Sequence, residues 1–154
     1  MESRFSLPEL NTELYHRMAA LSSAVENCGL DHKLLDLIKM RASQLNGCAY
    51  CIDIHSKDAR AIGETEQRLY ALSAWRETPF YTERERAALA LTEAITLITD
   101  GHVPDAVYEQ ARRVFDEKEV GQIVWAAAVI NTWNRLAIAA RSVPGSHHRD
   151  DSQP

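Results

Sequence analysis

The chain has 154 residues, 45% of them hydrophobic and 25% charged, which is enough for one globular domain with a buried core. Its formal net charge of −5, without any cluster of Lys and Arg, argues against a nucleic-acid partner. No apolar run approaches the roughly 20 residues of a membrane span, and the first residues lack the apolar segment of a signal peptide. We therefore expect a cytoplasmic protein without a membrane partner. In that reducing compartment a close cysteine pair is catalytic or metal-binding rather than structural.

Apolar residues recur at helical spacing along most of the chain, and no alternating strand pattern interrupts them. The stretches with this spacing are residues 9–27, 31–45, 48–62, 65–75, 82–99, a segment beginning at 104, and 117–141. Asp31 can cap its helix, and Thr82 and Asp116 each begin a capping-box match with a glutamate three residues later. We expect an all-α bundle of six to seven helices, with one domain at residues 1–143 and a disordered polar tail at residues 144–154.

The last expected helix, residues 117–141, is apolar nearly all round between Ile123 and Ile130. A helix without a polar face is buried in a core or in a subunit interface. Asn131, Asn134 and Arg135 interrupt the apolar surface and need hydrogen-bond partners if they are buried. We favour structural contacts for these three side chains over a place in a ligand pocket.

The most informative stretch is a C-x-x-C-x-x-x-H pattern formed by Cys48, Cys51 and His55, which share one face of a helix. Both cysteines fall in the expected first turn, where unpaired N–H groups and the helix dipole lower the pKa of a thiol. His55 lies one turn after Cys51 and can move a proton or stabilise the thiolate. A reactive thiolate beside a second thiol that can trap the oxidised sulfur is what reversible redox chemistry needs.

Two other interpretations of the cysteine pair are open at this point. The pair could be half of a tetrahedral zinc site with His55 as a third ligand, but the remaining cysteine, Cys28, has no spacing that completes it. The pair could also pack in the core without chemistry, as free cysteines do. Spacing favours the redox site, which needs neither a metal nor another cofactor.

The segment from Asp36 to His55 closely resembles the core of the alkylhydroperoxidase AhpD-like, carboxymuconolactone decarboxylase superfamily. The string S-Q-x-N-G-C-x-Y-C-x-x-x-H carries the resemblance. It continues through residues 75–77, 83–93 and 131–136 and covers about residues 30–140. The resemblance implies an all-helical fold that assembles as a homo-oligomer, commonly a trimer or hexamer.

The resemblance also implies roles for individual residues. Cys51 would attack the peroxide oxygen and become a sulfenic acid, Cys48 would resolve it to a disulfide, and His55 would belong to the proton relay. Asp36 holds the position of an acid twelve residues before the first cysteine, where AhpD-type enzymes usually have glutamate, although helical spacing alone places it at the solvent surface. Tyr50 stands between the cysteines where AhpD itself has histidine, which removes one candidate for the relay.

From the motif and the resemblance we expect an oxidoreductase that reduces organic hydroperoxides with an external dithiol or protein reductant. One alternative is a lyase that decarboxylates a γ-carboxymuconolactone-like substrate, although such chemistry has no need for a cysteine pair. Another is a non-catalytic oligomeric redox sensor, which Tyr50 and the apolar last helix favour.

Overall fold

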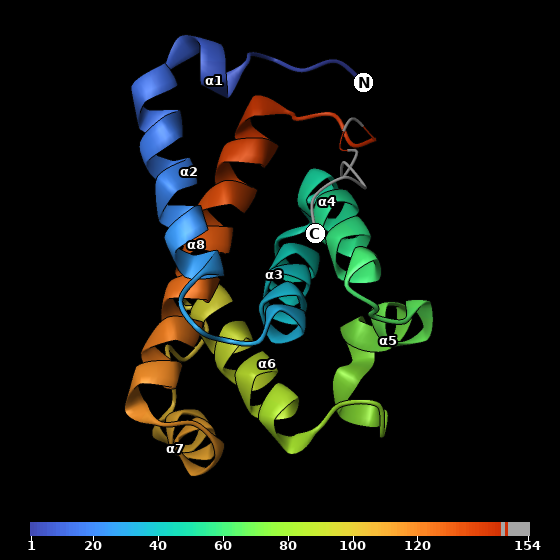
Figure 1. The fold of residues 1–154 in the computed structure, drawn as a ribbon, viewed down its shortest axis with the longest axis vertical. Coiled ribbons are helices and arrows are strands. Elements are labelled where there is room, and N and C mark those ends of the chain that lie inside the picture. The colour runs from blue at the N-terminus through green and yellow to red at the C-terminus, as the bar shows by residue number, and fades with distance from the viewer. Residues whose placement is uncertain (146, 148–154) are drawn as a thin grey trace.

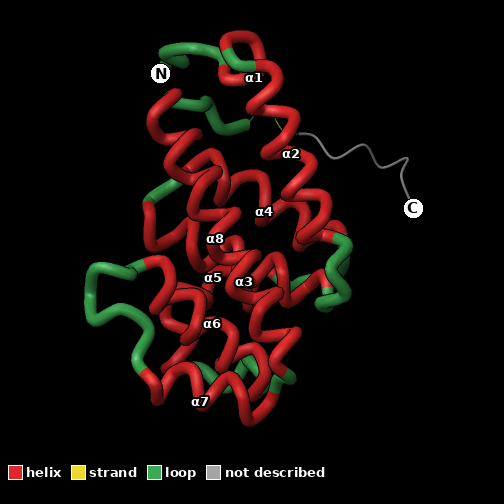
Figure 2. Tube along the Cα trace, turned by 90° about the vertical axis from the view of Figure 1, so that its left-hand side faces the viewer, coloured by secondary structure: helices red, strands yellow, loops and turns green. Residues whose placement is uncertain are grey.

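The computed structural model describes residues 1–145 and 147, and every regular element assigned within them is a helix (Figures 1 and 2). The helices in chain order are α1 (Leu7–Leu10), α2 (Thr12–Glu26), α3 (His32–Asn46), α4 (Ala49–Ala61), α5 (Glu66–Ala71), the 3-10 helix η1 (Leu72–Glu77), α6 (Glu83–Thr96), α7 (Asp105–Val114) and α8 (Glu117–Ala140). The all-α prediction is confirmed. The expected six to seven helices become eight α-helices and one 3-10 helix in the described residues, partly because Asn11, at φ −141° and ψ 58°, separates α1 from α2.

Side-chain caps fix where three of the longest helices begin. Asp31 accepts a hydrogen bond from a backbone N–H of the first turn of α3. Thr82 pairs with Glu85 before α6, and Asp116 pairs with Glu119 before α8, each in a complete capping box. Each cap satisfies N–H groups that have no partner within their own helix. The three starts predicted from the sequence are therefore confirmed.

Helix α3 lies in the middle of the molecule, packed against α4, α6 and α8 (Figure 1). It is buried on several sides, so residues outside its apolar stripe, including Asp36, Met40 and Ser43, are buried as well. Asp36 is only 7% exposed. The solvent-exposed position that helical spacing gives Asp36 is therefore wrong, because neighbouring helices cover the face on which it lies.

Helix α8 packs against α2, α3, α4 and α6. Its 24 residues, with a mean hydropathy of 1.2 in the most apolar window, are long and apolar enough to cross a membrane. This corrects the sequence estimate that no stretch comes near that length. Half of the window is buried inside the molecule, as in a core helix, while Val124 and Trp125 are exposed on its outer side.

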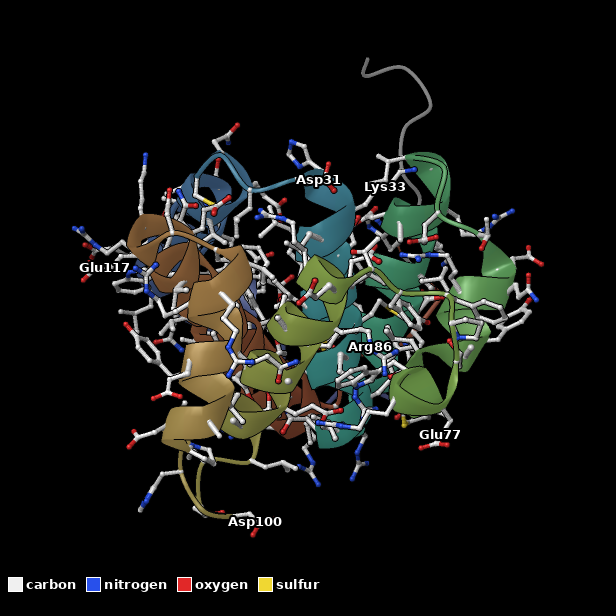
Figure 3. The ribbon with its side chains drawn as sticks, turned by 90° about the horizontal axis from the view of Figure 1, so that it is seen from below. Asp31, Lys33, Glu77, Arg86, Asp100 and Glu117 are labelled. Atoms are coloured by element: carbon white, nitrogen blue, oxygen red, sulfur yellow. A yellow bond between two sulfur atoms is a disulfide. The ribbon has the colours of Figure 1, made fainter. Side chains whose placement is uncertain are left out.

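The irregular end of η1 is held by Arg86 of α6 (Figure 3). The Arg86 guanidinium donates hydrogen bonds of 2.9–3.0 Å to the backbone carbonyls of Trp75, Arg76 and Thr78. Three carbonyls at the end of η1 thus share one cation. This arrangement keeps Trp75, which is 4% exposed, packed in the core.

The described end of the chain lies against α4. The Gly145 N–H donates to Asp53 Oδ2 at 2.9 Å, and His147 Nε2 is 3.0 Å from Asp58 Oδ1. The predicted disordered tail spans residues 144–154; residues 144, 145 and 147 are described, and residues 146 and 148–154 lie outside the described residues.

Candidate active site

The turn between α3 and α4 positions the two cysteines. Gly47 ends α3 with φ 67°, a left-handed conformation that glycine adopts without steric cost. The Cys48 N–H then donates to the Ser43 carbonyl at 3.0 Å, and Cys48 becomes the N-cap residue of α4. The interruption between the helices expected at residues 31–45 and 48–62 is confirmed.

Cys48 and Cys51 form a disulfide, with their Cα atoms 5.4 Å apart. The Sγ atom of Cys48 also accepts a hydrogen bond from the Cys51 backbone N–H at 3.3 Å. The two residues are 1% and 4% exposed and pack in a small apolar cluster with Ala42, Ile130 and Ala137. The structure thus joins the predicted pair and places it in the core between α3, α4 and α8.

A buried amide network clamps the end of α3 to α8. The Asn46 Nδ2 group donates to Asn131 Oδ1 at 2.9 Å and to Asn134 Oδ1 at 2.8 Å. Asn134 is fully buried, and its Nδ2 group donates to Ser43 Oγ at 3.0 Å. The network therefore holds Ser43 and Asn46, which flank the turn into Cys48. The structural contacts favoured for Asn131 and Asn134 are present.

His55 lies one turn beyond Cys51 on α4, and its Nδ1 atom is buried without a hydrogen-bond partner. Burial, together with the positive charges of Lys39 and His147, lowers the pKa of His55 to about 3. The imidazole is therefore neutral at physiological pH, with one nitrogen able to accept a proton and the other able to donate one.

His55 borders a cavity of about 100 Å³ that is lined by both polar and apolar side chains. The other residues lining this cavity, called the His55 cavity below, are Ser22, Val25, Glu26, Lys39, Ala126, Val129, Ile130 and Trp133. Ile130 and Trp133 also contact the cysteine cluster. The cavity thus lies between the disulfide region and the ion pair of Glu26, at the end of α2, with Lys39.

Lys39 is the cation of this region, and its side chain is only 10% exposed. Its ammonium bonds to Glu26 of α2 and lies 3.8 Å from Asp36 Oδ1. Asp36 does not line the His55 cavity but a separate one of about 680 Å³, which it shares with Glu26 and Lys39. The structure therefore gathers Cys48, Cys51 and His55, and it places Asp36 beyond Lys39.

Two polar residues of the His55 cavity, Glu26 and Lys39, are absent from the sequence-based site. Lys39 falls three residues after Asp36, a spacing that pairs opposite charges on a helix. The spacing between Asp36 and Lys39 could therefore have identified Lys39 from the sequence. Glu26 ends a different helix, and no local pattern connects it with His55.

The charge of Lys39 gives a testable expectation for His55. Replacing Lys39 by methionine should raise the His55 pKa above its value of about 3, because the substitution removes a cation and frees the Glu26 carboxylate. The measurement is an NMR titration of the imidazole C–H signals. Lys33→Met, which removes an exposed lysine of α3, is the matched control and should leave the titration unchanged. An unaltered His55 titration in Lys39→Met would contradict this electrostatic account.

Glu93 anchors a second polar cluster, distant from the motif in sequence. Its carboxylate accepts hydrogen bonds from Arg41 Nε at 2.7 Å, from Trp75 Nε1 at 2.8 Å and from Arg76. Burial raises the pKa of Glu93, but these three donors outweigh it and hold the pKa below its ordinary value. The cluster joins α3, η1 and α6. Trp75, Arg76 and Glu93 lie in segments that resemble the superfamily, and their contacts in this cluster give them a structural role.

The fold and the site together define an all-helical protein with a bonded pair of cysteines at the start of α4 and a neutral histidine one turn later. Among the described residues, no three His, Cys, Asp or Glu side chains lie close enough together to hold a metal ion.

The model of the carboxymuconolactone decarboxylase family matches residues 12–94. The uncharacterized protein YdfG of Bacillus subtilis (strain 168) is 44% identical to this chain over 139 residues, which are 90% of this chain and 95% of YdfG. The chain therefore belongs to the carboxymuconolactone decarboxylase family.

Solved structures show the same fold. The Agrobacterium tumefaciens protein ATU0492, of unknown function and with a suggested role as the antioxidant defence protein AhpD, superposes with a TM-score of 0.92. It is 40% identical, and the match covers 95% of this chain and all of that one. The alkylhydroperoxidase AhpD core of an uncharacterized peroxidase-related protein from Ralstonia eutropha JMP134 is 19% identical, with a TM-score of 0.79 over 88% of this chain and 73% of that one. The predicted AhpD-like membership is confirmed.

Proposed function

We propose that the protein is a thiol-dependent oxidoreductase that reduces organic hydroperoxides by cycling Cys48 and Cys51 between dithiol and disulfide. The observation that carries the proposal is the bonded pair of sulfurs at the start of α4, one turn before a neutral His55. Membership of a family with AhpD-like relatives supports it.

In the first step the Cys51 thiol attacks the terminal oxygen of the hydroperoxide. The S–O bond forms as the O–O bond breaks, so Cys51 is oxidised to a sulfenic acid and the peroxide is reduced to an alcohol. The thiol proton ends on the departing alkoxide oxygen. His55 is suited to move that proton because its neutral ring can accept a proton at one nitrogen while the other releases one.

In the second step the Cys48 thiol attacks the sulfenic sulfur of Cys51. The disulfide forms, and the Cys48 proton leaves with the hydroxyl group as water. The Cα separation of 5.4 Å is within the range that a disulfide spans, and both residues are fixed by the first turn of α4.

An external dithiol closes the cycle by donating two electrons to the disulfide. Its thiolate attacks Cys51, and Cys48 leaves as a thiolate that the Cys51 N–H and the positive end of α4 stabilise. A stabilised leaving thiolate speeds this exchange. The N-cap position of Cys48 therefore suits the resolving and leaving role, while Cys51 lies closer to His55 along the helix.

The cellular setting is part of the same proposal. We place the protein in the cytoplasm, where a dithiol or protein reductant is available, and as a homo-oligomer of three or six chains. Exposed Val124 and Trp125 on the outer side of α8 are suited to contact a second copy. Light scattering after size-exclusion chromatography measures the assembly, and a monomer would contradict this part.

Thiol counting followed by a turnover assay tests the proposed function. One equivalent of tert-butyl hydroperoxide should remove two of the three thiols of the reduced chain and leave Cys28. With excess dithiothreitol, peroxide consumption should then continue over many turnovers. Stoichiometric oxidation without turnover would instead indicate a redox sensor. Decarboxylation of a carboxymuconolactone that survives thiol alkylation would indicate the lyase alternative.

A further inference from the structure

We propose that Glu26, at the end of α2, is the carboxylate that exchanges protons with His55 during peroxide reduction. The proposal rests on the function proposed above and extends it to a residue outside the cysteine motif. Glu26 acts through His55, so its role is to take up and return a proton rather than to contact the substrate.

The first observation is the composition of the His55 cavity. Glu26 is the only carboxylate among the residues that line it, whereas Asp36 lines the neighbouring cavity. Asp36 is one methylene shorter than the glutamate usual at its position in the proteins that the sequence resembles. His55 Nδ1 is buried without a hydrogen-bond partner. A histidine with an unpartnered ring nitrogen and a glutamate thus line the same cavity.

The second observation is the way in which Glu26 is held. Lys39 bonds to the Glu26 carboxylate and also lies beside Asp36, so the ammonium fixes both acids. The Glu26 side chain is 39% exposed, whereas that of Asp36 is 10% exposed. Of the two acids, Glu26 therefore has the more direct path to solvent, where a proton can be exchanged between turnovers.

The chemistry of the first step explains why His55 needs such a partner. A ring with a pKa of about 3 does not store the thiol proton as an imidazolium at neutral pH. The proton that enters at one nitrogen must therefore be matched by one that leaves from the other to Glu26. When the O–O bond breaks, Glu26 returns a proton through His55 to the departing alkoxide. The sum is one thiol and one hydroperoxide converted to one sulfenic acid and one alcohol.

Two reactions of the reduced protein separate this role from a structural one. Alkylation of Cys51 by iodoacetamide releases iodide, which needs no proton, whereas reduction of a hydroperoxide releases an alkoxide, which does. Glu26→Gln should therefore slow the stopped-flow reaction with tert-butyl hydroperoxide by about 10- to 100-fold. It should not slow alkylation, because removing a negative charge near the thiol favours the thiolate.

A carboxylate-specific rescue and a matched control complete the test. Glu26→Ala should be slow with peroxide and should recover in proportion to added formate, which restores a carboxylate. Glu13→Gln, which removes an exposed carboxylate from the other end of α2, should leave both reactions unchanged.

Three results would overturn the role of Glu26. They are a peroxide rate within twofold of wild type in Glu26→Gln, a parallel loss of both reactions, and a loss confined to Asp36→Asn. Wild-type protein that is alkylated but does not react with peroxide would instead sink the proposed function.

Discussion

Cys51→Ser should abolish dithiol-dependent peroxide reduction, lowering turnover by at least about a thousandfold, because a serine hydroxyl neither ionises near pH 7 nor forms a disulfide. Cys48→Ser should behave differently. It retains the attacking thiol, so it should consume one equivalent of peroxide and then stop as a Cys51 sulfenic acid. Trapping with dimedone and intact-mass spectrometry distinguishes the two variants.

The third cysteine supplies the control for this experiment. Cys28 lies at the end of α2 as a free, partly buried thiol outside the disulfide, and Cys28→Ser should keep wild-type turnover. The reverse pattern, with a dimedone adduct on Cys48 in the Cys51→Ser protein, would show that Cys48 attacks first. The roles assigned above to the two sulfurs would then be exchanged.

Asn134→Leu should be the most destabilising single change near the site, at about 2–4 kcal/mol. Leucine has a similar volume, but it leaves the buried Ser43 hydroxyl and one contact of Asn46 without an amide partner. For a chain of this size the loss corresponds to a fall in Tm of roughly 5–15 °C. Urea and thermal unfolding of the reduced protein measure it.

A control substitution on the same helix separates the effect of losing the buried amide network from the effect of changing helix propensity. Thr132 lies on the exposed face of α8, where its hydroxyl donates only to the carbonyl one turn earlier. Thr132→Ala should therefore change the free energy of unfolding by less than about 0.5 kcal/mol. Equal effects of the two substitutions would show that the amide network contributes nothing specific.

The helix starts were predictable because their determinants are local. Asp31, Thr82 and Asp116 lie within three residues of the N–H groups that they cap, so the sequence alone contains the whole interaction. The separation of α1 from α2 at Asn11 was not predictable in the same way. Apolar residues continue at helical spacing through that point, so the non-helical backbone of Asn11 has no counterpart in the local pattern.

The same distinction divides the candidate site. Cys48, Cys51 and His55 lie within two helical turns, and a short motif was enough to place them together. The burial of Asp36 follows from helices that cover α3, and the place of Glu26 follows from the packing of α2 beside His55. Neither fact has a counterpart in the spacing of residues along the chain. The proposed proton path therefore depends on the packing of α2, α3 and α4.

The near-complete burial of both sulfurs has a consequence for steady-state kinetics. One enclosed pair, 1% and 4% exposed, must meet the oxidising and the reducing substrate in turn, so the two cannot react with it in the same complex. Under the proposed cycle, double-reciprocal plots at several dithiol concentrations are parallel lines, as in a ping-pong mechanism. High concentrations of either substrate then inhibit by competing for the enzyme form that belongs to the other.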